Sequence, residues 1–316
     1  MTSTGLRIAA VQMQPVLGDV DTNLSSAERL IRTAFDQQAE WVILPEFFTS
    51  GMAFHPVMLD AARPVDGVPL QLLQRLAQEY GGVIGGSFLA ERGAHVYNTF
   101  ALVFPDGMVQ FHDKDQPTMW ENCYYVGGSD TGVLDTPIGT VGAALCWELI
   151  RTRTIQRLEN QVNLVVGGAC WWGLPDYVPP EHLLHTENLM LLRSVPVTFA
   201  RLLGVPVVFA SHAGHFEGYK PPDETTLQHR PYMGETQIVD GYGTVLAHMA
   251  REEGEGIIVA NIVPGVIDAP RLPLPDRFWI PDLTQPYLSA WNDLNRFGED
   301  YYQRVAMPYR IRQSSV

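Results

Sequence analysis

Short apolar runs alternate with amphipathic stretches along most of the chain. A compact apolar run bounded by turn residues is typical of a buried strand, whereas apolar residues spaced three and four apart indicate a helix. This pattern predicts helices over residues 21–35, 70–80 and 182–203. It predicts strands at 6–13, 41–44, 83–88, 97–104, 108–112, 140–146, 164–168, 205–210, 237–239, 244–248 and 256–262.

Turn and cap residues separate these elements. Asp21 is placed to cap the first helix, and Gly81-Gly82 ends the second. Pro105-Asp106-Gly107 predicts a hairpin turn, because proline presets φ and glycine accepts a positive φ. Pro196 lies inside the third predicted helix and is expected to kink or split it. The order of elements favours an α/β fold with mixed sheets and helices on their outer faces over an all-parallel barrel.

The character of the chain changes at Asp268. Prolines cluster up to Pro286, and aromatic residues continue beyond them with little strand pattern. Such a segment cannot form a core of its own. We therefore predict one domain over residues 1–267 and a C-terminal arm over 268–316 that packs on the domain or on a partner subunit.

Composition and charge narrow the range of partners. Of 316 residues, 46% are hydrophobic and 18% charged, which is an ordinary globular balance. A net charge of -14 repels phosphate backbones and anionic lipid, so we expect neither nucleic acid nor membrane as a partner. Three cysteines do not form a disulfide framework, and residues 1–13 lack the features of a signal peptide. No apolar run approaches the roughly 20 residues of a membrane span. These features predict a cytoplasmic protein.

Three reactive side chains follow predicted strands. Glu46 lies directly after an apolar strand and beside two phenylalanines, where desolvation raises a carboxyl pKa toward that of a general base. Lys114 ends a hairpin strand and could stabilise an oxyanion. Cys146 ends a strand rich in small residues and precedes a helical pattern, which is the layout of a nucleophile elbow. Each residue alone is also compatible with a solvated charge or a buried structural thiol.

Further residues near these positions are candidates for a substrate pocket. Glu121 is a second carboxylate in aromatic surroundings. Arg151 could bind a substrate carboxylate, although a solvated helix face explains it as well. Aromatic side chains close to the reactive segments would line a pocket for a flat or apolar group, or pack in the core: Phe47, Tyr124, Trp147, Trp171 and Trp172. Some histidines occur in pairs close together in the sequence, but no third ligand lies beside either pair. We therefore expect no metal site.

Taken together, these segments resemble the nitrilase superfamily of carbon–nitrogen hydrolases. The resemblance rests on Pro45-Glu46-Phe47, on Lys114 with the loop to Gly128, and on Gly142 to Glu148, and it covers roughly residues 6–264. It implies a four-layer α-β-β-α sandwich, a homodimer or larger homo-oligomer, and no metal or cofactor. It also implies catalytic roles for Glu46, Lys114 and Cys146, with Glu121 as an accessory glutamate and the Trp147 backbone N–H as an oxyanion donor.

Two departures from the family pattern bear on the substrate. Asp113 stands where many relatives have arginine, and Cys146-Trp147-Glu148 is similar to the nitrilase branch. The resemblance therefore predicts that the small-molecule substrate is a nitrile or a small amide. It also predicts that hydrolysis proceeds through a cysteine thioester. An N-carbamoyl amidohydrolase, an acyltransferase and a catalytically silent binding protein remain alternatives.

Overall fold

The computed structural model describes residues 5–313. Its strands are β1 (Leu6–Met13), β2 (Trp41–Ile43), β3 (Arg63–Pro64), β4 (Val83–Arg92), β5 (His95–Val103), β6 (Val109–Asp113), β7 (Val133–Thr136), β8 (Gly139–Leu145), β9 (Leu164–Ala169), β10 (Val207–His212), β11 (His215–Tyr219), β12 (Leu227–Pro231), β13 (Thr236–Val239), β14 (Val245–Met249) and β15 (Gly256–Ile262). Its α-helices are α1 (Val20–Asp36), α2 (Val68–Tyr80), α3 (Thr152–Leu158), α4 (Leu183–Leu203), α5 (Gln285–Tyr301) and α6 (Met307–Gln313).

Short helical turns link several of these elements. They are the 3₁₀ turns η1 (Pro56–Asp60), η2 (Met119–Cys123), η3 (Cys146–Ile150) and η4 (Arg251–Glu253), and the π-helical turn η5 (Tyr302–Ala306) between α5 and α6. The turn η2 comes shortly after Lys114, and η3 begins at Cys146, so both adjoin residues that the sequence predicts to be reactive.

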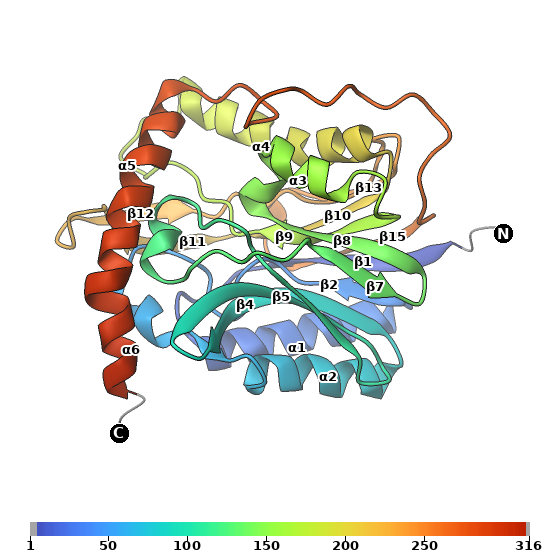
Figure 1. Cartoon of the computed structure of the whole chain (residues 1–316), viewed down its shortest axis with the longest axis horizontal. Helices are drawn as coiled ribbons and strands as arrows, with labels where there is room; N and C mark the ends of the chain where they lie inside the picture. Colours follow the sequence, from blue (N-terminus) through green and yellow to red (C-terminus); the bar gives the residue numbers. More distant parts are fainter. Residues whose placement is uncertain (1–4, 314–316) are drawn as a thin grey trace.

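The strands form two stacked layers that are joined at one corner. The order is β6-β5-β4-β2-β1 in one layer and β10-β9-β8-β7 in the other, with β15 beside β1 and β13-β14 beside β10. The join is a short parallel pairing at Gln12↔Ser211 and Met13↔His212. Helices α1 and α2 cover one outer face, and α3 and α4 cover the other (Figure 1). The predicted four-layer α-β-β-α sandwich is confirmed.

Alternation along the strands explains the layering. In β1, Ala9 and Val11 pack in the cluster under α1 and α2, whereas Ile8 and Ala10 face the second sheet. In β8, Ala143 lies between the sheets and Ala144 lies in the cluster on the far side. Because successive side chains of a strand point to opposite faces, apolar residues at every position bury both faces of both sheets.

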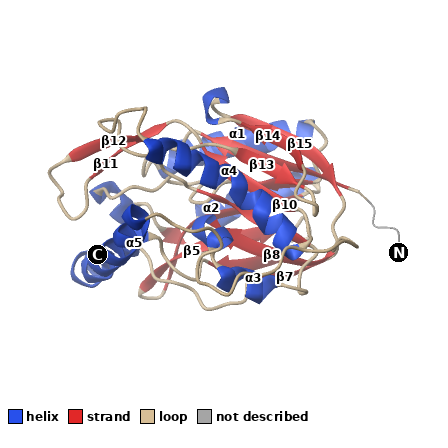
Figure 2. Ribbon diagram, turned by 90° about the horizontal axis from the view of Figure 1, so that it is seen from above, coloured by secondary structure: helices blue, strands red, loops and turns tan. Residues whose placement is uncertain are grey.

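Two sequence expectations need correction. Helix α4 runs from Leu183 to Leu203 without a break, so Pro196 does not split it. Pro196 is buried, as are Val195 and Phe199 on the same helix, and burial of this apolar face offsets the missing backbone hydrogen bond. The helix lies lengthwise over the second sheet (Figure 2). The strand expected over residues 140–146 ends at Leu145, and Cys146 already belongs to η3.

The C-terminal arm packs on its own domain. An extended segment crosses the layer of α3 and α4, and α5 then descends along the edge of both sheets (Figure 1). Phe54 lies against Phe297 and Tyr301 of α5, with ring centroids 5.4 and 5.5 Å apart. The division at residue 267 stays a prediction, and residues 1–4 and 314–316 of the two predicted segments lie outside the described range.

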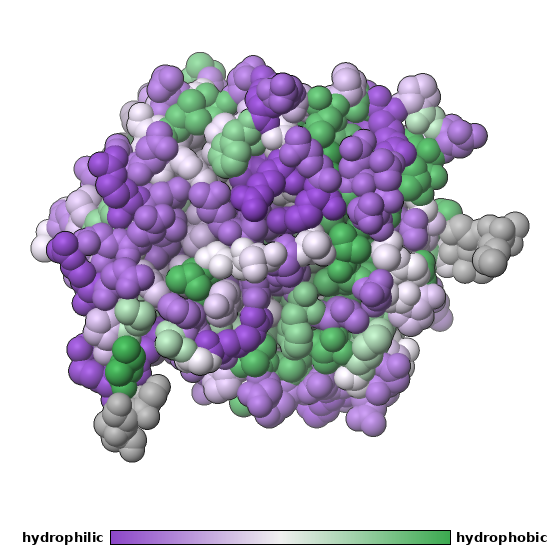
Figure 3. All heavy atoms as spheres, viewed as in Figure 1, coloured by the Kyte–Doolittle hydropathy of each residue, from purple (hydrophilic) through white to green (hydrophobic). Residues whose placement is uncertain are grey.

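Polar and apolar residues are mixed on the side of the molecule that Figure 3 displays. Within residues 5–313, none of the helices combines the length and hydropathy that crossing a bilayer requires.

The contact between β8 and β9 yields a stability prediction. A Cβ at Gly167 would lie 1.9 Å from the carbonyl oxygen of Ala144, which is backbone and cannot move aside easily. Gly167→Ala should therefore lower the free energy of unfolding by about 2 kcal/mol or more in a denaturant titration. Gly5→Ala is the control, because the nearest atom there is 3.8 Å away. Equal stability of the two variants would contradict the close approach of these strands.

Candidate active site

Cys146 stands on a tight turn at the end of β8. Its φ is 51°, a left-handed conformation that is uncommon for a residue other than glycine, and η3 begins at this residue. The backbone N–H of Leu145 donates to Glu148 Oε2 at 2.9 Å, which fixes the turn from behind. The nucleophile elbow expected from the sequence is thus present as a strand, a strained residue and a helical turn.

Glu46 follows β2 and has no exposed surface. Its Oε1 accepts hydrogen bonds from Lys114 Nζ at 2.9 Å and Asn98 Nδ2 at 2.8 Å. Its Oε2 accepts one from the backbone N–H of Cys170 at 2.9 Å. The carboxylate is therefore held from three directions by β5, by the segment after β6 and by the segment after β9.

Lys114 is fully buried between two carboxylates. Besides its bond to Glu46, its Nζ donates to Glu121 Oε2 at 2.8 Å. The same Glu121 oxygen accepts from the backbone N–H of Thr118 at 2.9 Å and from the Tyr125 hydroxyl. An ammonium group carries three N–H donors, and two of those on Lys114 are occupied by side chains within residues 5–313. One donor is left for a substrate.

Burial and charge set the protonation of these groups. Loss of solvent, opposed by the Lys114 ammonium and assisted by Glu121, raises the pKa of Glu46 to about 7. Burial alone would lower the pKa of Lys114, but Glu121 and Glu46 hold it well above its usual value. Burial, with a further contribution from Glu46, raises the pKa of the Cys146 thiol well above its usual value. Near neutral pH this site thus holds a thiol, an ammonium group and a carboxyl that can exchange a proton.

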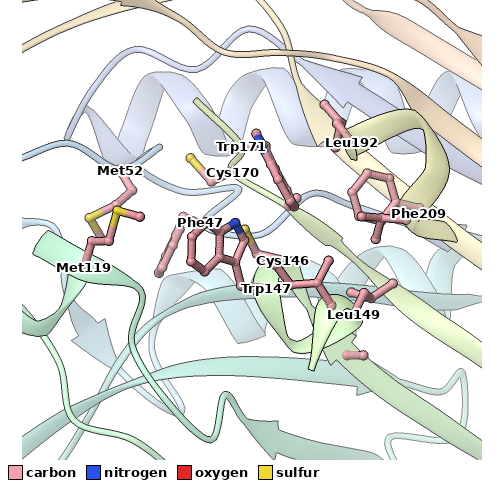
Figure 4. Close-up of a cluster of buried hydrophobic side chains, with 14 of the residues drawn as sticks. Phe47, Met52, Met119, Cys146, Trp147, Leu149, Cys170, Trp171, Leu192 and Phe209 are labelled. Atoms are coloured by element: carbon pink, nitrogen blue, oxygen red, sulfur yellow. The ribbon is translucent and has the colours of Figure 1, made fainter. Parts of the chain in front are cut away.

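Cys146 opens on a cavity of about 200 Å³. Figure 4 shows its sulfur among Phe47, Trp147, Cys170 and Trp171, which belong to one buried cluster. The cavity is lined by Met119, Trp120, Cys146, Trp147, Cys170, Trp171, Trp172, Gly173, Leu174, Leu184, Asn188, Arg230, Pro286, Tyr287, Ala290 and Leu294. One wall of the cavity is therefore helix α5 of the arm.

The structure divides the candidate pocket residues into two groups. Trp147, Trp171 and Trp172 line the cavity. Phe47 packs against Tyr125, and the Tyr124 hydroxyl donates to the carbonyl of His55 at 3.0 Å, so neither lines it.

Arg151 also lies away from the cavity. It has no exposed surface, pairs with Asp115 and donates from Nε to the Trp147 carbonyl at 3.2 Å. These bonds place Arg151 behind the elbow, where it supports the turn rather than facing a substrate.

Reading the sequence missed several residues that contribute to the site. Asn98, which binds Glu46, lies in the middle of β5 with no local signal for this contact. Arg230 and Asn188 reach the cavity from β12 and α4, which tertiary packing brings to it. Tyr287 had a detectable signal, since Tyr287, Trp291, Leu294 and Tyr301 keep helical spacing in the arm.

The chain matches a known family of enzymes. The carbon-nitrogen hydrolase family matches residues 7–271 of the chain. The chain belongs to the carbon–nitrogen hydrolase family. It is 30% identical to a nitrilase from Pyrococcus abyssi over 81% of this chain and 89% of that protein.

Other members of the family show partial or distant likeness. Identity with the N-carbamoylputrescine amidase of Solanum lycopersicum is 34% over 45% of this chain, and the match spans about half (50%) of that relative's length. An amidase variant from Nesterenkonia sp. AN1 shares the fold with a TM-score of 0.63 at 18% identity, over 84% of this chain and 92% of that one. Within residues 5–313, no three histidine, cysteine or acidic side chains are grouped as a metal site would require.

Asp113, which departs from the family pattern next to Lys114, forms its side-chain hydrogen bonds away from that lysine. Its Oδ1 accepts from Arg92 Nη2 at 2.7 Å and from the Thr99 hydroxyl at 2.6 Å. The acid is thus paired with Arg92 at the end of β4, and Lys114 keeps its two glutamates.

A buried charge network connects the elbow to the lysine segment in this family member. Glu148 Oε2 accepts from His112 Nε2 at 3.0 Å, and Oε1 accepts from Arg157 Nη2 and from the backbone N–H of Asp115, both at 3.1 Å. Burial alone would raise the pKa of Glu148, but His112, Arg157 and Arg151 hold it well below its usual value. The carboxylate ties the residue before Cys146 to the residue after Lys114.

Replacing Glu148 should separate these two segments. Glu148→Gln removes one of the two carboxylates that each of His112 and Arg157 contacts, leaving Asp130 and Asp115, and we expect the free energy of unfolding to fall by about 1–3 kcal/mol. Because the lysine and the elbow lose their common anchor, kcat should fall more than KM rises. Denaturant titration and steady-state kinetics measure both. Glu79→Gln, which breaks only surface pairs with Arg32 and Arg75, is the control and should change little. Wild-type stability and kcat in Glu148→Gln would be inconsistent with this anchoring.

Proposed function

We propose that this protein hydrolyses a non-peptide carbon–nitrogen bond in a nitrile or small amide through a thioester on Cys146. The observation that carries the proposal is that the buried pair Glu46 and Lys114, 2.9 Å apart, acts electrostatically on the strained Cys146 in the cavity lining. Family membership supports the same chemistry. In the Nesterenkonia relative, the acetamide moiety of fluoroacetamide is covalently attached at the active-site cysteine.

The first half-reaction forms the thioester. Glu46 accepts the proton of the Cys146 thiol as the sulfur attacks the amide carbon. Lys114, through its remaining N–H, and the backbone N–H of Trp147 stabilise the negative charge on the oxygen. The Trp147 donor is available because the first N–H groups of a helical turn have no partner within it. The carbon–nitrogen bond then breaks, and the amine leaves with the proton held by Glu46.

The second half-reaction returns the enzyme to its starting state. Glu46 takes a proton from water, whose oxygen attacks the thioester carbon. The carbon–sulfur bond breaks, the acid is released and the sulfur regains its proton. Glu121 holds Lys114 in place through both steps, since it is the second carboxylate on the ammonium group. With a nitrile, attack gives a thioimidate that must add one water and lose ammonia before this stage.

An N-carbamoyl substrate is the second candidate. Similarity to N-carbamoylputrescine amidases favours it. Arg151 adds no support, because it pairs with Asp115 behind the elbow and does not line the cavity. Measuring ammonia release from matched nitriles, primary amides and N-carbamoyl compounds distinguishes the three classes.

We also propose a cytoplasmic homodimer or larger homo-oligomer. Three buried free cysteines are compatible with a reducing compartment. Light scattering of the purified protein tests the oligomeric state.

Removing the nucleophile tests the chemistry directly. Cys146→Ala should abolish turnover and the acyl-enzyme mass increment while leaving the fold intact, and Glu46→Gln and Lys114→Ala should each lower kcat by roughly a hundredfold or more. Intact-mass spectrometry and circular dichroism measure these outcomes. Cys123→Ala is the matched control, because Cys123 is buried and does not line the cavity. Turnover by Cys146→Ala would refute the mechanism.

The pKa of Glu46 predicts an acid limb in the pH–rate profile. The base must be ionised, and its raised pKa of about 7 means that the active carboxylate is lost as pH falls below that value. We therefore expect kcat/KM to rise with pH up to about 7 and then level off. Asn98→Leu removes a donor that favours the carboxylate, so its acid limb should move to higher pH. A flat profile down to pH 5 would exclude Glu46 as the base.

A further inference from the structure

The polar side chains of the cavity offer hydrogen-bond donors. Arg230 comes from β12, Trp120 from η2 and Tyr287 from α5. The lining contains no aspartate or glutamate. The amide oxygen of Asn188 is already occupied, because it accepts from Trp171 Nε1 at 2.8 Å. A ligand that fits these walls must therefore bring acceptors.

Arg230 is the one charged side chain in the lining. Its Nε and Nη2 donate to Gln228 Oε1 at 3.2 and 2.7 Å, and its Nη1 donates to the carbonyl of Gly173 at 3.2 Å. A guanidinium has five N–H groups, so two remain after these three bonds. Within residues 5–313, no carboxylate forms a salt bridge with Arg230, in contrast to Arg151 and Arg157 behind the elbow.

Arg230 and two aromatic residues form a stack at the cavity. The guanidinium carbon of Arg230 lies 5.5 Å from the ring centroid of Trp120, and the centroids of Trp120 and Trp172 are 4.2 Å apart. Stacking fixes the plane of the guanidinium and excludes water from one of its faces. Burial without an acidic partner lowers the pKa of Arg230 to about 10, which still leaves it cationic near neutral pH.

Two more donors of the lining have no partner. Trp120 is only 5% exposed, and its Nε1 donates to no atom within residues 5–313. The Tyr287 hydroxyl is likewise buried and without a hydrogen-bond partner in that range. Buried donors without partners are destabilising and are rare in folded proteins. Their occurrence in the same cavity lining as an arginine that lacks an acid indicates a site for an anion.

We infer that the substrate carries a carboxylate at the end opposite its scissile carbon–nitrogen bond, and that Arg230 binds this carboxylate. This inference rests on the proposed hydrolase function. The planar guanidinium matches the two oxygens of a carboxylate, and the Trp120 N–H and Tyr287 hydroxyl supply further donors. Trp147 and Trp171 pack against the apolar middle of the molecule. The cavity of about 200 Å³ admits only a small compound of this class.

Pairs of substrates that differ only in this charge test the inference. Each pair consists of a dicarboxylic acid monoamide and the alkyl amide in which a methyl group replaces the carboxylate, in a series of chain lengths. The wild-type protein should prefer the monoamide by about 10- to 100-fold in kcat/KM. Arg230→Gln should reduce this preference to near unity, chiefly through a higher KM for the monoamide. Arg230→Lys should keep part of the preference, and Trp120→Phe should reduce it modestly.

Arg75→Gln, a surface change at the Glu28 pair, is the control and should leave the preference intact. Equal use of both amides by the wild-type protein, or an equal loss for both in Arg230→Gln, would overturn the inference while leaving the hydrolase proposal standing.

Calorimetry keeps the two proposals distinguishable. If no amide, nitrile or N-carbamoyl compound acylates Cys146, the proposed function fails. Binding of the monoamides to Cys146→Ala then still reports on the pocket. Binding by Cys146→Ala that weakens at least tenfold on adding Arg230→Gln supports the carboxylate site, and binding that is unchanged by Arg230→Gln, or absent, refutes it.

Discussion

Lys114 is an ammonium group without exposed surface, and its burial is compensated only because Glu46 and Glu121 lie on either side of it. Taking one charge out of water costs several kcal/mol, and an unpaired charge at this depth would be intolerable. The two carboxylates come from different parts of the chain, so the sandwich must bring the segments after β2 and β6 and the turn η2 together. Pairing Lys114 with two carboxylates therefore constrains the fold, and it also brings together the charged groups of the site.

The surroundings of each buried carboxylate differ. Glu121 receives three hydrogen bonds at one oxygen, whereas Glu46 receives bonds at both oxygens and its pKa is raised to about 7. Lys114 therefore lies next to a carboxyl group that can exchange a proton near neutral pH. Behind the elbow, Glu148 is surrounded by cations and its pKa is held low, so that it serves as an anchor. Similar carboxylates thus differ in behaviour because their neighbours differ.

Local sequence patterns could predict most strands of the two layers, because strand ends carry both periodicity and turn signals, but they did not predict β3, β7, β11 or β12. Glu46, Lys114 and Cys146 each follow an apolar run that can be read without coordinates. Arg230 could not be found in this way, since nothing in Leu227–Pro231 marks a pocket and the residue reaches the cavity only through packing of the β11-β12 hairpin. Arg151, in contrast, lies close to Cys146 in the sequence, which suggests that it binds substrate. Its side chain instead pairs with the buried carboxylate of Asp115.

The arm illustrates how a segment without its own core becomes part of the site. Trp147, the residue after the nucleophile, stacks on Trp291 of α5 with ring centroids 5.5 Å apart and meets Trp279 of the arm edge-on at 5.2 Å. Trp147 and Trp291 are buried and Trp279 is partly buried, because the domain and the arm cover each other. Since the Trp147 backbone N–H is also the proposed oxyanion donor, the packing that holds the arm in place orients the elbow as well. The apolar residues of 268–316 therefore complete the cavity, and they stiffen the turn at Cys146.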